Sequence, residues 1–293
     1  MTMNLCVFDI GGSRVKYGYY SNEGLTDLGS FVTPETFLEM KTELSKVLSC
    51  FKEKYDLDGV AFSAPGAVDS KNDVISGLSA VPYIHNFPIR KEFEELFQLP
   101  VSMENDANCA ALAELHEGAA MDADNAIFMV IGSGIGGAVI INRTLHRGRN
   151  LFGGEFGYML IDGQNSLSSL GSPVKMARRY AVESGEKSVE GSEVFRRADE
   201  GEALAIKYVD MLIDALARGI FNLTCAFNPD KIIIGGGISK REDLIARLQC
   251  RTKFYMEGKG AEGIDVDIVP CRFRSEANLI GAAVHYMEDK RIL

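Results

Sequence analysis

Short apolar runs and glycine-rich turns alternate along this chain, and longer helical periodicities separate them. Residues 5–8 and 15–20 are runs of strand length, and the alternation that continues to about Phe31 predicts a β-meander. Residues 34–54 follow at helical spacing. The next apolar run predicts a buried strand that ends in a turn at Gly66.

The second half of the chain shows the same kinds of element. Two β-branched runs within residues 126–141 flank a glycine-rich stretch and predict strand, turn and strand. Residues 202–227 are apolar on nearly every side of a helix, which predicts a central buried helix. A buried strand at 231–234 then leads through three glycines to a helix that starts near Arg241, and the last helix covers 277–287.

The segment Glu104-Asn105-Asp106-Ala107-Asn108 joins a strand-like run to a helical pattern. Asp106 is expected at or near the helix N-cap, where amide donors hold a carboxylate ionised while its second oxygen faces a substrate hydroxyl. This is the position that a general base needs. The alternative is that Asp106 only caps its helix.

Three glycine-rich turns follow strand-like runs. In the first, Ser13 and Lys16 offer donors to a phosphate, and Asp9 can face a magnesium ion. The second, within 131–137, matches neither the dinucleotide fingerprint nor the Walker loop. The three turns, together with the acidic helix start, predict one nucleotide held in a cleft. The turn residues expected to approach it are Gly11, Gly12, Gly132, Ser133, Gly134, Gly136, Gly235, Gly236 and Gly237.

Composition excludes some classes of function. The net charge is −10 without a basic run, which disfavours a nucleic-acid surface. Residues 126–141 are interrupted by glycines and too short to span a membrane, and the first strand begins so early that no signal peptide is expected. Six cysteines without C-x-x-C spacing predict reduced core thiols in a cytoplasmic protein. They are Cys6, Cys50, Cys109, Cys225, Cys250 and Cys271.

The ordered set of these motifs resembles the ROK sugar kinases of the actin-like ATPase superfamily. The motifs are 9–13, 105–108, 132–137, Gly153-Gly154-Glu155-Phe156-Gly157, Asn228-Pro229 and 234–237. The resemblance covers essentially the whole chain and implies an α/β, two-lobed actin-like ATPase (ribonuclease H-like) fold with a central cleft. It implies an N-terminal lobe, 1–117, with the sugar site and a phosphate loop, joined by the last helix, 277–293. A C-terminal lobe, 118–276, would carry nucleotide binding and dimerisation.

The same resemblance implies an activity. ATP and Mg²⁺ would serve transfer of the γ-phosphate to the primary (6-)hydroxyl of a hexose, of N-acetylmannosamine or of a β-glucoside, with Asp106 as base. The implied partners are a small-molecule sugar and a second copy in a homodimer. Gly66 and Glu155 each have an alternative as plain turn residues. The implied sugar-binding residues are Gly66, Asn86, Asn105, Asp106 and Glu155.

Two departures from the family pattern affect the metal content. ROK kinases usually place a His and then a cysteine-rich zinc loop after the Gly-Glu-x-Gly turn, whereas this chain has Tyr158 and a loop, 162–174, without cysteine. Zinc needs about four N, S or O ligands in close spacing, so we predict a zinc-free member. An inactive sugar sensor is the alternative function. A ROK repressor is not expected, because only eight residues precede Asp9.

Overall fold

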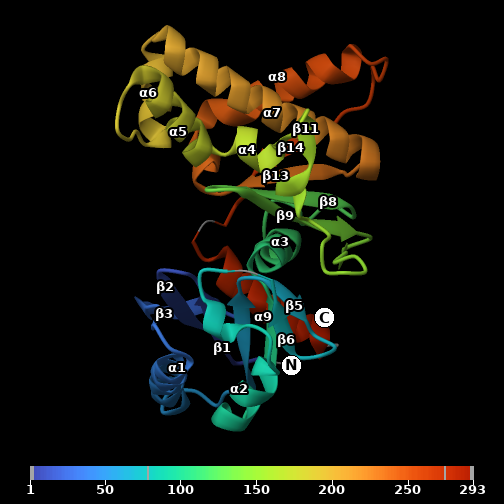
Figure 1. Cartoon of the computed structure of the whole chain (residues 1–293). Helices are drawn as coiled ribbons and strands as arrows, with labels where there is room; N and C mark the ends of the chain where they lie inside the picture. Colours follow the sequence, from blue (N-terminus) through green and yellow to red (C-terminus); the bar gives the residue numbers. More distant parts are fainter. Residues whose placement is uncertain (1–2, 78, 274, 291–293) are drawn as a thin grey trace. The chain divides into compact units, whose positions relative to one another are not determined.

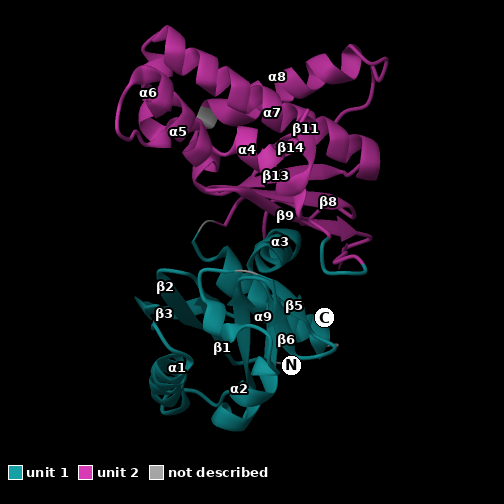
Figure 2. Cartoon of the chain, in the orientation of Figure 1, with its two compact units in different colours: residues 1–117, 149–152, 275–293 teal, residues 118–148, 153–274 magenta. Residues whose placement is uncertain are grey.

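A computed structural model describes residues 3–77, 79–273 and 275–290 (Figure 1). The chain forms two compact units (Figure 2). Unit 1 consists of Met1–Glu117, Arg149–Phe152 and Ser275–Leu293. Unit 2 consists of Gly118–Gly148 and Gly153–Arg274.

Unit 1 is built on a five-stranded sheet in the order β3-β2-β1-β4-β7. The first three strands form the antiparallel meander predicted from sequence, while β4 and β7 run parallel to β1. A short hairpin, β5–β6, follows β4. The strands are β1 Leu5–Ile10, β2 Arg14–Ser21, β3 Gly24–Val32, β4 Gly59–Ala64, β5 Ala67–Asp69, β6 Val74–Ser76 and β7 Val101–Asn105.

Four helices complete unit 1. The core joins apolar side chains of α1 (Phe37–Lys52) and α2 (Ile89–Phe97) to the sheet, and it includes the stacked rings of Phe8 and Phe62, 5.2 Å apart. Helix α9 (Ala277–Asp289) packs across β1, β4 and β7 and against α3 (Asp106–Glu117). A 3₁₀ turn, η1 (Pro82–Ile84), lies between β6 and α2 along the chain.

Unit 2 repeats this sheet topology in the order β10-β9-β8-β13-β14. Strands β10, β9 and β8 are antiparallel, and β13 and β14 run parallel to β8. The strands are β8 Ala126–Ile131, β9 Ile135–Ile141, β10 Thr144–Leu145, β13 Lys231–Gly235 and β14 Asp267–Pro270, with a small β11–β12 pair at Leu160–Asp162 and Asn165–Ser166. In each unit a glycine turn connects the first two strands of the sheet.

The helices of unit 2 gather around α7. Its apolar face lies in the core, and it contacts each of the other four helices of the unit. Because these helices pack around it, its sequence is apolar on nearly every side. Ion pairs such as Asp210–Arg247, at 3.0 Å, link its outer side to α8. The helices are α4 Leu167–Gly171, α5 Pro173–Ser184, α6 Gly191–Asp199, α7 Ala203–Phe227 and α8 Glu242–Glu257, with 3₁₀ turns η2 Phe156–Tyr158 and η3 Gly237–Lys240.

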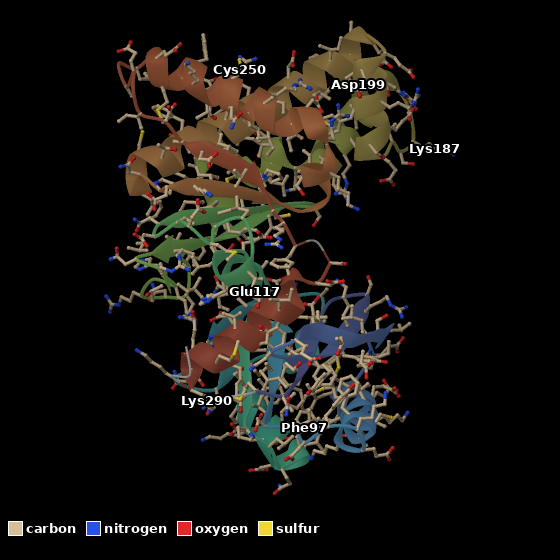
Figure 3. The ribbon with its side chains drawn as sticks, turned by 180° about the vertical axis from the view of Figure 1, so that it is seen from behind. Phe97, Glu117, Lys187, Asp199, Cys250 and Lys290 are labelled. Atoms are coloured by element: carbon tan, nitrogen blue, oxygen red, sulfur yellow. The ribbon has the colours of Figure 1, made fainter. Side chains whose placement is uncertain are left out.

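Three details of the sequence prediction were wrong. The segment 162–174 is not a loop, because it forms β12, α4 and the start of α5. Gly136 and Gly137 lie inside strand β9 rather than in the turn before it. The cysteines are not all core thiols, since three are exposed on helices: Cys50, Cys225 and Cys250, the last labelled in Figure 3.

Among the described residues, no helix combines the length and the apolar character that crossing a bilayer requires.

Candidate active site

Asp106 is the first residue of α3 and directly follows strand β7. The side chain that caps this helix belongs to Asn105, whose Oδ1 accepts the backbone N–H groups of Ala107 and Asn108 at 3.0 and 3.2 Å. Asp106 Oδ1 accepts the N–H of Ala107 at 2.8 Å. Because Asn105 supplies the cap, the second carboxylate oxygen of Asp106 is not needed to hold the helix end.

The surroundings of Asp106 favour its protonated form. Burial is the largest influence and raises the pKa of this carboxyl above its ordinary value, and the negative charge of Asp9 raises it further. The hydrogen bond from Ala107 acts in the opposite direction and is outweighed. The amide donor expected from the sequence is present, but its effect on the pKa is smaller than that of burial. The resulting carboxylate is more basic than an exposed Asp, which suits a general base.

Asn105 also connects two parts of the expected sugar site. Its Nδ2 donates to the carbonyl oxygen of Gly66 at 3.0 Å. Gly66 has φ +102°, and a Cβ there would lie 2.8 Å from His85 Cε1 and from the carbonyl oxygen of Ser76, so only glycine fits. The turn after β4 and the start of α3 are thus held together by the side chain of Asn105.

Asn86 and His85 lie on the neighbouring segment of unit 1. Asn86 is exposed, and its N–H donates to the carbonyl of Ile75 in β6 at 2.9 Å. His85 is buried against the Gly66 turn, with Nε2 2.7 Å from Ser79 Oγ, and burial lowers its pKa. The contact of His85 with Gly66 depends on the fold, so no local sequence pattern indicates it.

Asp9 lies near the C-terminal end of strand β1, and its side chain is buried, with 6% of the residue exposed. Ser63 Oγ and Asn278 Nδ2 both donate to its Oδ1, at 2.8 and 2.9 Å. Lys16 Nζ lies 3.7 Å from its Oδ2 and also donates to the carbonyl of Ser275. Asn278 was not predicted from the sequence; the only signal was one amide in the mostly apolar first half of the last helix.

These contacts leave Asp9 suited to magnesium. Its oxygens are hard ligands, and Oδ1 is held in place by two neutral donors. The described part of the chain contains no group of three His, Cys, Asp or Glu side chains that could enclose a metal. Proteins usually bind Mg²⁺ through one or two carboxylates together with substrate phosphates, so a single carboxylate fits this ion.

The first glycine turn is braced on several sides. Gly11 N donates to the carbonyl of Arg14 at 3.1 Å, and Thr33 Oγ1 donates to the carbonyl of Gly11 at 2.6 Å. A Cβ on Gly12 would lie 2.5 Å from that of Ala80. Gly12 and Ser13 are exposed at the tip of this turn.

Unit 2 brings the other two glycine segments together. Gly235 pairs with Val130 where β13 and β8 end, and a Cβ on Gly236, which has φ +87°, would collide with the carbonyl oxygen of Ile131. The turn Gly132-Ser133-Gly134 and the segment 235–237 therefore meet at the same edge of the sheet. Gly136 lies in β9 beside this turn.

Glu155 lies in unit 2 and is exposed, directly after Gly154. Gly154 has φ +97°, and a Cβ there would collide with the carbonyl of Gly137, so this turn also requires glycine. Tyr158, at the end of the same 3₁₀ turn, is 70% exposed. Of the five expected sugar contacts, four belong to unit 1 and Glu155 belongs to unit 2.

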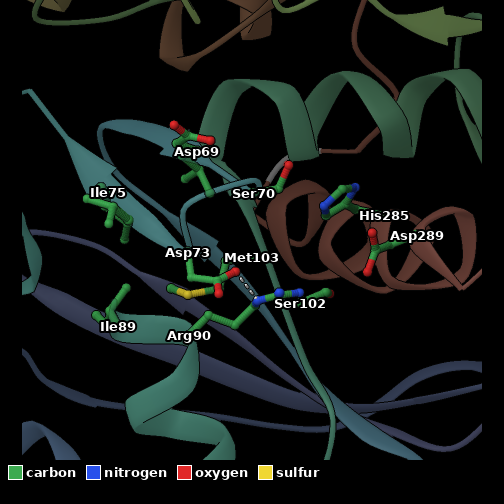
Figure 4. Close-up of a pocket in the computed structure, with 12 residues that line it drawn as sticks. Asp69, Ser70, Asp73, Ile75, Ile89, Arg90, Ser102, Met103, His285 and Asp289 are labelled. Atoms are coloured by element: carbon green, nitrogen blue, oxygen red, sulfur yellow. Dashed lines mark ion pairs between the residues drawn. The ribbon is translucent and has the colours of Figure 1, made fainter. Parts of the chain in front are cut away.

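A separate small pocket in unit 1 contains none of the expected site residues (Figure 4). It lies among the β5–β6 hairpin, the start of α2, strand β7 and the end of α9. Arg90 Nε and Asp73 Oδ1 form an ion pair in it at 2.6 Å. Because these two charges satisfy each other, we assign this pocket no part in the site.

Comparisons with known proteins show what the chain is similar to over nearly its whole length. The model of the ROK family matches residues 5–288. A β-glucoside kinase of Listeria monocytogenes is 33% identical, over 98% of this chain and 99% of its own. A β-glucoside kinase of Klebsiella pneumoniae is 32% identical, over 97% and 96%. A solved ROK family protein from Streptococcus pneumoniae, in complex with sucrose, has a TM-score of 0.92 and 35% identity, over 99% of this chain and 100% of that one.

Proposed function

The chain belongs to the ROK family, and on this premise we propose that it is an ATP-dependent sugar kinase that phosphorylates the primary (6-)hydroxyl of a β-glucoside. The observation that carries the proposal is Asp106, a carboxylate with a raised pKa whose helix is capped by its neighbour. The choice of a β-glucoside is supported by the two β-glucoside kinases, each above 30% identity over nearly the whole chain.

In the proposed reaction Asp106 accepts the proton of the 6-hydroxyl while the hydroxyl oxygen attacks the γ-phosphorus of ATP. The bond from this phosphorus to the β–γ bridging oxygen breaks, and ADP leaves. Asn105 and Gly66 hold one side of the sugar, with Asn86 on the same unit and Glu155 supplied by unit 2. Backbone N–H groups of the glycine turns stabilise the charge that develops on the phosphates. Magnesium held by Asp9 would neutralise part of the phosphate charge.

A hexose or N-acetylmannosamine remains the competing substrate, and an inactive sugar sensor remains the competing function. A coupled assay with ATP and a panel of glucose, N-acetylmannosamine and cellobiose distinguishes these alternatives from the proposed β-glucoside kinase. We expect the highest kcat/KM with cellobiose, and phosphorus NMR of the product should locate the phosphate on the 6-oxygen. Calorimetry with the same sugars measures whether each one binds and how tightly.

The outcomes of this experiment are distinct. Higher kcat/KM with glucose or N-acetylmannosamine would replace the proposed substrate. Sugar binding without turnover on any member of the panel would replace the kinase by a sensor. A mock preparation from cells that carry the empty vector is the control for contaminating kinases, and it should show no turnover with any member of the panel.

A further inference from the structure

Two serines of unit 2 form hydrogen bonds with the backbone at the two ends of the turn Gly132-Ser133-Gly134. We propose that Ser172 and Ser168 are positioning residues, which hold this turn so that its N–H groups bind the phosphates of the nucleotide. The inference rests on the proposed kinase function and extends it to residues of the segment that was expected to be a loop.

Ser172 is fully buried between α4 and α5. Its hydroxyl lies 2.7 Å from the carbonyl oxygen of Gly132 and 3.0 Å from that of Ser133, so its single proton is shared between two successive carbonyls. The same oxygen accepts the N–H of Lys175 at 3.3 Å and thereby caps α5. One side chain thus connects the end of the turn to a twelve-residue helix.

The orientation of these carbonyls determines where the amides of the turn point. In a trans peptide the N–H is antiparallel to the C=O of the same plane. Because the carbonyls of Gly132 and Ser133 face Ser172, the N–H groups of Ser133 and Gly134 face away from it. Within the described residues no backbone or side-chain acceptor pairs with either N–H. Successive amides that point the same way form an anion-binding concavity.

Ser168 holds the other end of the turn. Its Oγ accepts the N–H of Ile135 at 2.8 Å, where β9 begins. A Cβ on Gly134 would lie 3.4 Å from the same oxygen, so the turn lies directly against this helix. Arg179 of α5 in turn donates to the carbonyls of Ser169 and Leu170, which fixes the short helix α4. The turn is therefore held at one end by Ser168 of α4 and at the other by Ser172, the N-cap of α5.

The ligand that fits this arrangement is the polyphosphate of a nucleoside triphosphate. The two exposed amides offer neutral donors and no side-chain charge, which matches a magnesium-bound phosphate chain in an acidic protein of net charge −10. A sugar has no group that needs two parallel N–H donors. Loss of either serine should therefore weaken nucleotide binding without changing sugar binding.

The test measures two affinities by calorimetry: that for ADP in the presence of Mg²⁺, and that for cellobiose. Both are measured in Ser172→Ala, Ser172→Thr and Ser168→Ala. We expect Ser172→Ala to bind ADP about tenfold more weakly, the effect of one or two lost hydrogen bonds. Ser172→Thr keeps the hydroxyl and should bind ADP nearly as the wild type does. Thr36→Ala, which removes the N-cap of α1 in unit 1, is the control for loss of a cap without contact to the turn.

Unchanged ADP affinity in Ser172→Ala would overturn the proposal. An equal loss of ADP and cellobiose binding would also overturn it, because it would indicate general damage to the fold. If Ser172→Ala gives no cooperative thermal transition, Ser168→Ala decides by the same criterion. Failure of the proposed function gives a different pattern, in which the wild type binds ADP but phosphorylates no sugar.

Discussion

At the scale of single residues, two neighbours in the site have different roles: Asn105 is structural, whereas Asp106 is the proposed base. Asn105 uses its amide oxygen to cap α3 and its amide nitrogen to hold Gly66. Asp106 is thereby left as a half-buried carboxylate whose raised pKa has no compensating ion pair among its causes. Such a group costs folding free energy when it is ionised, and active sites commonly contain groups of this kind.

Replacing Asp106 by Asn separates chemistry from binding. Asn keeps the size and the oxygen that accepts from Ala107 but cannot take the proton of the sugar hydroxyl. We expect kcat to fall by about 10²–10⁴-fold while sugar affinity stays near that of the wild type. Kinetics and calorimetry on the same preparation measure the two effects, and a wild-type kcat would reduce Asp106 to a structural residue.

The pH dependence of activity provides a second test at this residue. The base acts only when it is ionised, so kcat/KM should fall as the pH falls through the raised pKa of Asp106. The acidic limb should therefore lie above the value of about 3.9 of an ordinary Asp. The folded state also holds this proton more tightly than the unfolded state, so the contribution of Asp106 to stability decreases as the pH rises through the same range.

This sign gives a matched control. Asp106→Asn has no such titration and should melt at a higher temperature than the wild type near neutral pH, with the difference vanishing at a pH below both pKa values. Thermal denaturation at several pH values measures this difference. An acidic limb of kcat/KM at an ordinary Asp pKa, together with a lower melting temperature of the variant at neutral pH, would contradict the buried-base interpretation.

Residues that act through distant contacts were the ones that the sequence could not reveal. Asn278 reaches Asp9 across 269 positions, and Ser172 reaches Gly132 across 40. Ser172 precedes a proline as a helix cap does, but no local pattern at either residue indicates its long-range contact. In contrast, Asp106 was identified because its signal is local: an acid at the junction of an apolar run and a helical repeat.

At the scale of elements, long periodic segments were predicted well and capped short ones were not. The strand before three glycines and the helix 202–227 appear as β13 and α7 with nearly the expected bounds. Helices α4 and α5 were missed although Ser166 and Ser172 cap them and Pro173 occupies the first position of α5. Ser-Pro at a helix start was a usable signal, but the resemblance to ROK kinases, which have a zinc loop at this place, led to the prediction of a loop.

Helices α3 and α9 are a second case in which glycine decides packing. A Cβ on Gly281 would collide with the backbone carbonyl of Cys109, so the two helices approach backbone to backbone. This contact fixes α9, which carries Asn278, against α3, which begins at Asp106. The close approach therefore supports two parts of the site at once.

Gly281→Ala should destabilise the protein by roughly 1–3 kcal/mol, because the methyl group meets backbone that cannot move aside. Intrinsic helix propensity alone would favour Ala by about 1 kcal/mol, so the sign of the change is diagnostic. Gly219→Ala in α7 is the matched control, since its Cβ would meet only the end of the Leu167 side chain, at 2.8 Å. Urea unfolding of both variants tests the difference, and a stabilised Gly281→Ala would contradict it.

At the scale of the whole molecule, the two units share one sheet topology. Each begins with antiparallel strands joined by a glycine turn and continues with parallel strands at the other side. The actin-like ATPase fold expected from the resemblance to ROK kinases is confirmed by the structural relative with a TM-score of 0.92. The motif order predicted the fold, whereas the pairing of β13 with β8 could not be obtained from local patterns.

The metal content follows from residues of unit 2. Tyr158 and the cysteine-free segment 162–174 offer no set of zinc ligands. We expect elemental analysis of the purified protein to find no stoichiometric zinc, and activity with excess magnesium to survive a zinc-selective chelator. Addition of zinc after the chelator is the control, and it should not change the kinase activity. About one zinc per chain would contradict this prediction.

Distribution of the proposed ligand contacts over both units leads to a prediction about motion. Asn105 and Asp106 belong to unit 1, whereas Glu155 belongs to unit 2, and the glycine turns are divided in the same way. If one sugar receives contacts from both units, its binding should favour a more closed state that excludes water from phosphoryl transfer. Small-angle scattering should then show a smaller radius of gyration when a phosphorylatable sugar is added.

The Asp106→Asn variant makes this measurement independent of turnover, because it is expected to bind sugar without consuming it. Its radius of gyration should fall as that of the wild type does, whereas Glu155→Gln should require more sugar for the same change. A sugar of the panel that calorimetry shows not to bind serves as the negative control. An unchanged radius of gyration at saturating sugar would mean that binding does not close the units, and exclusion of water would then need another source.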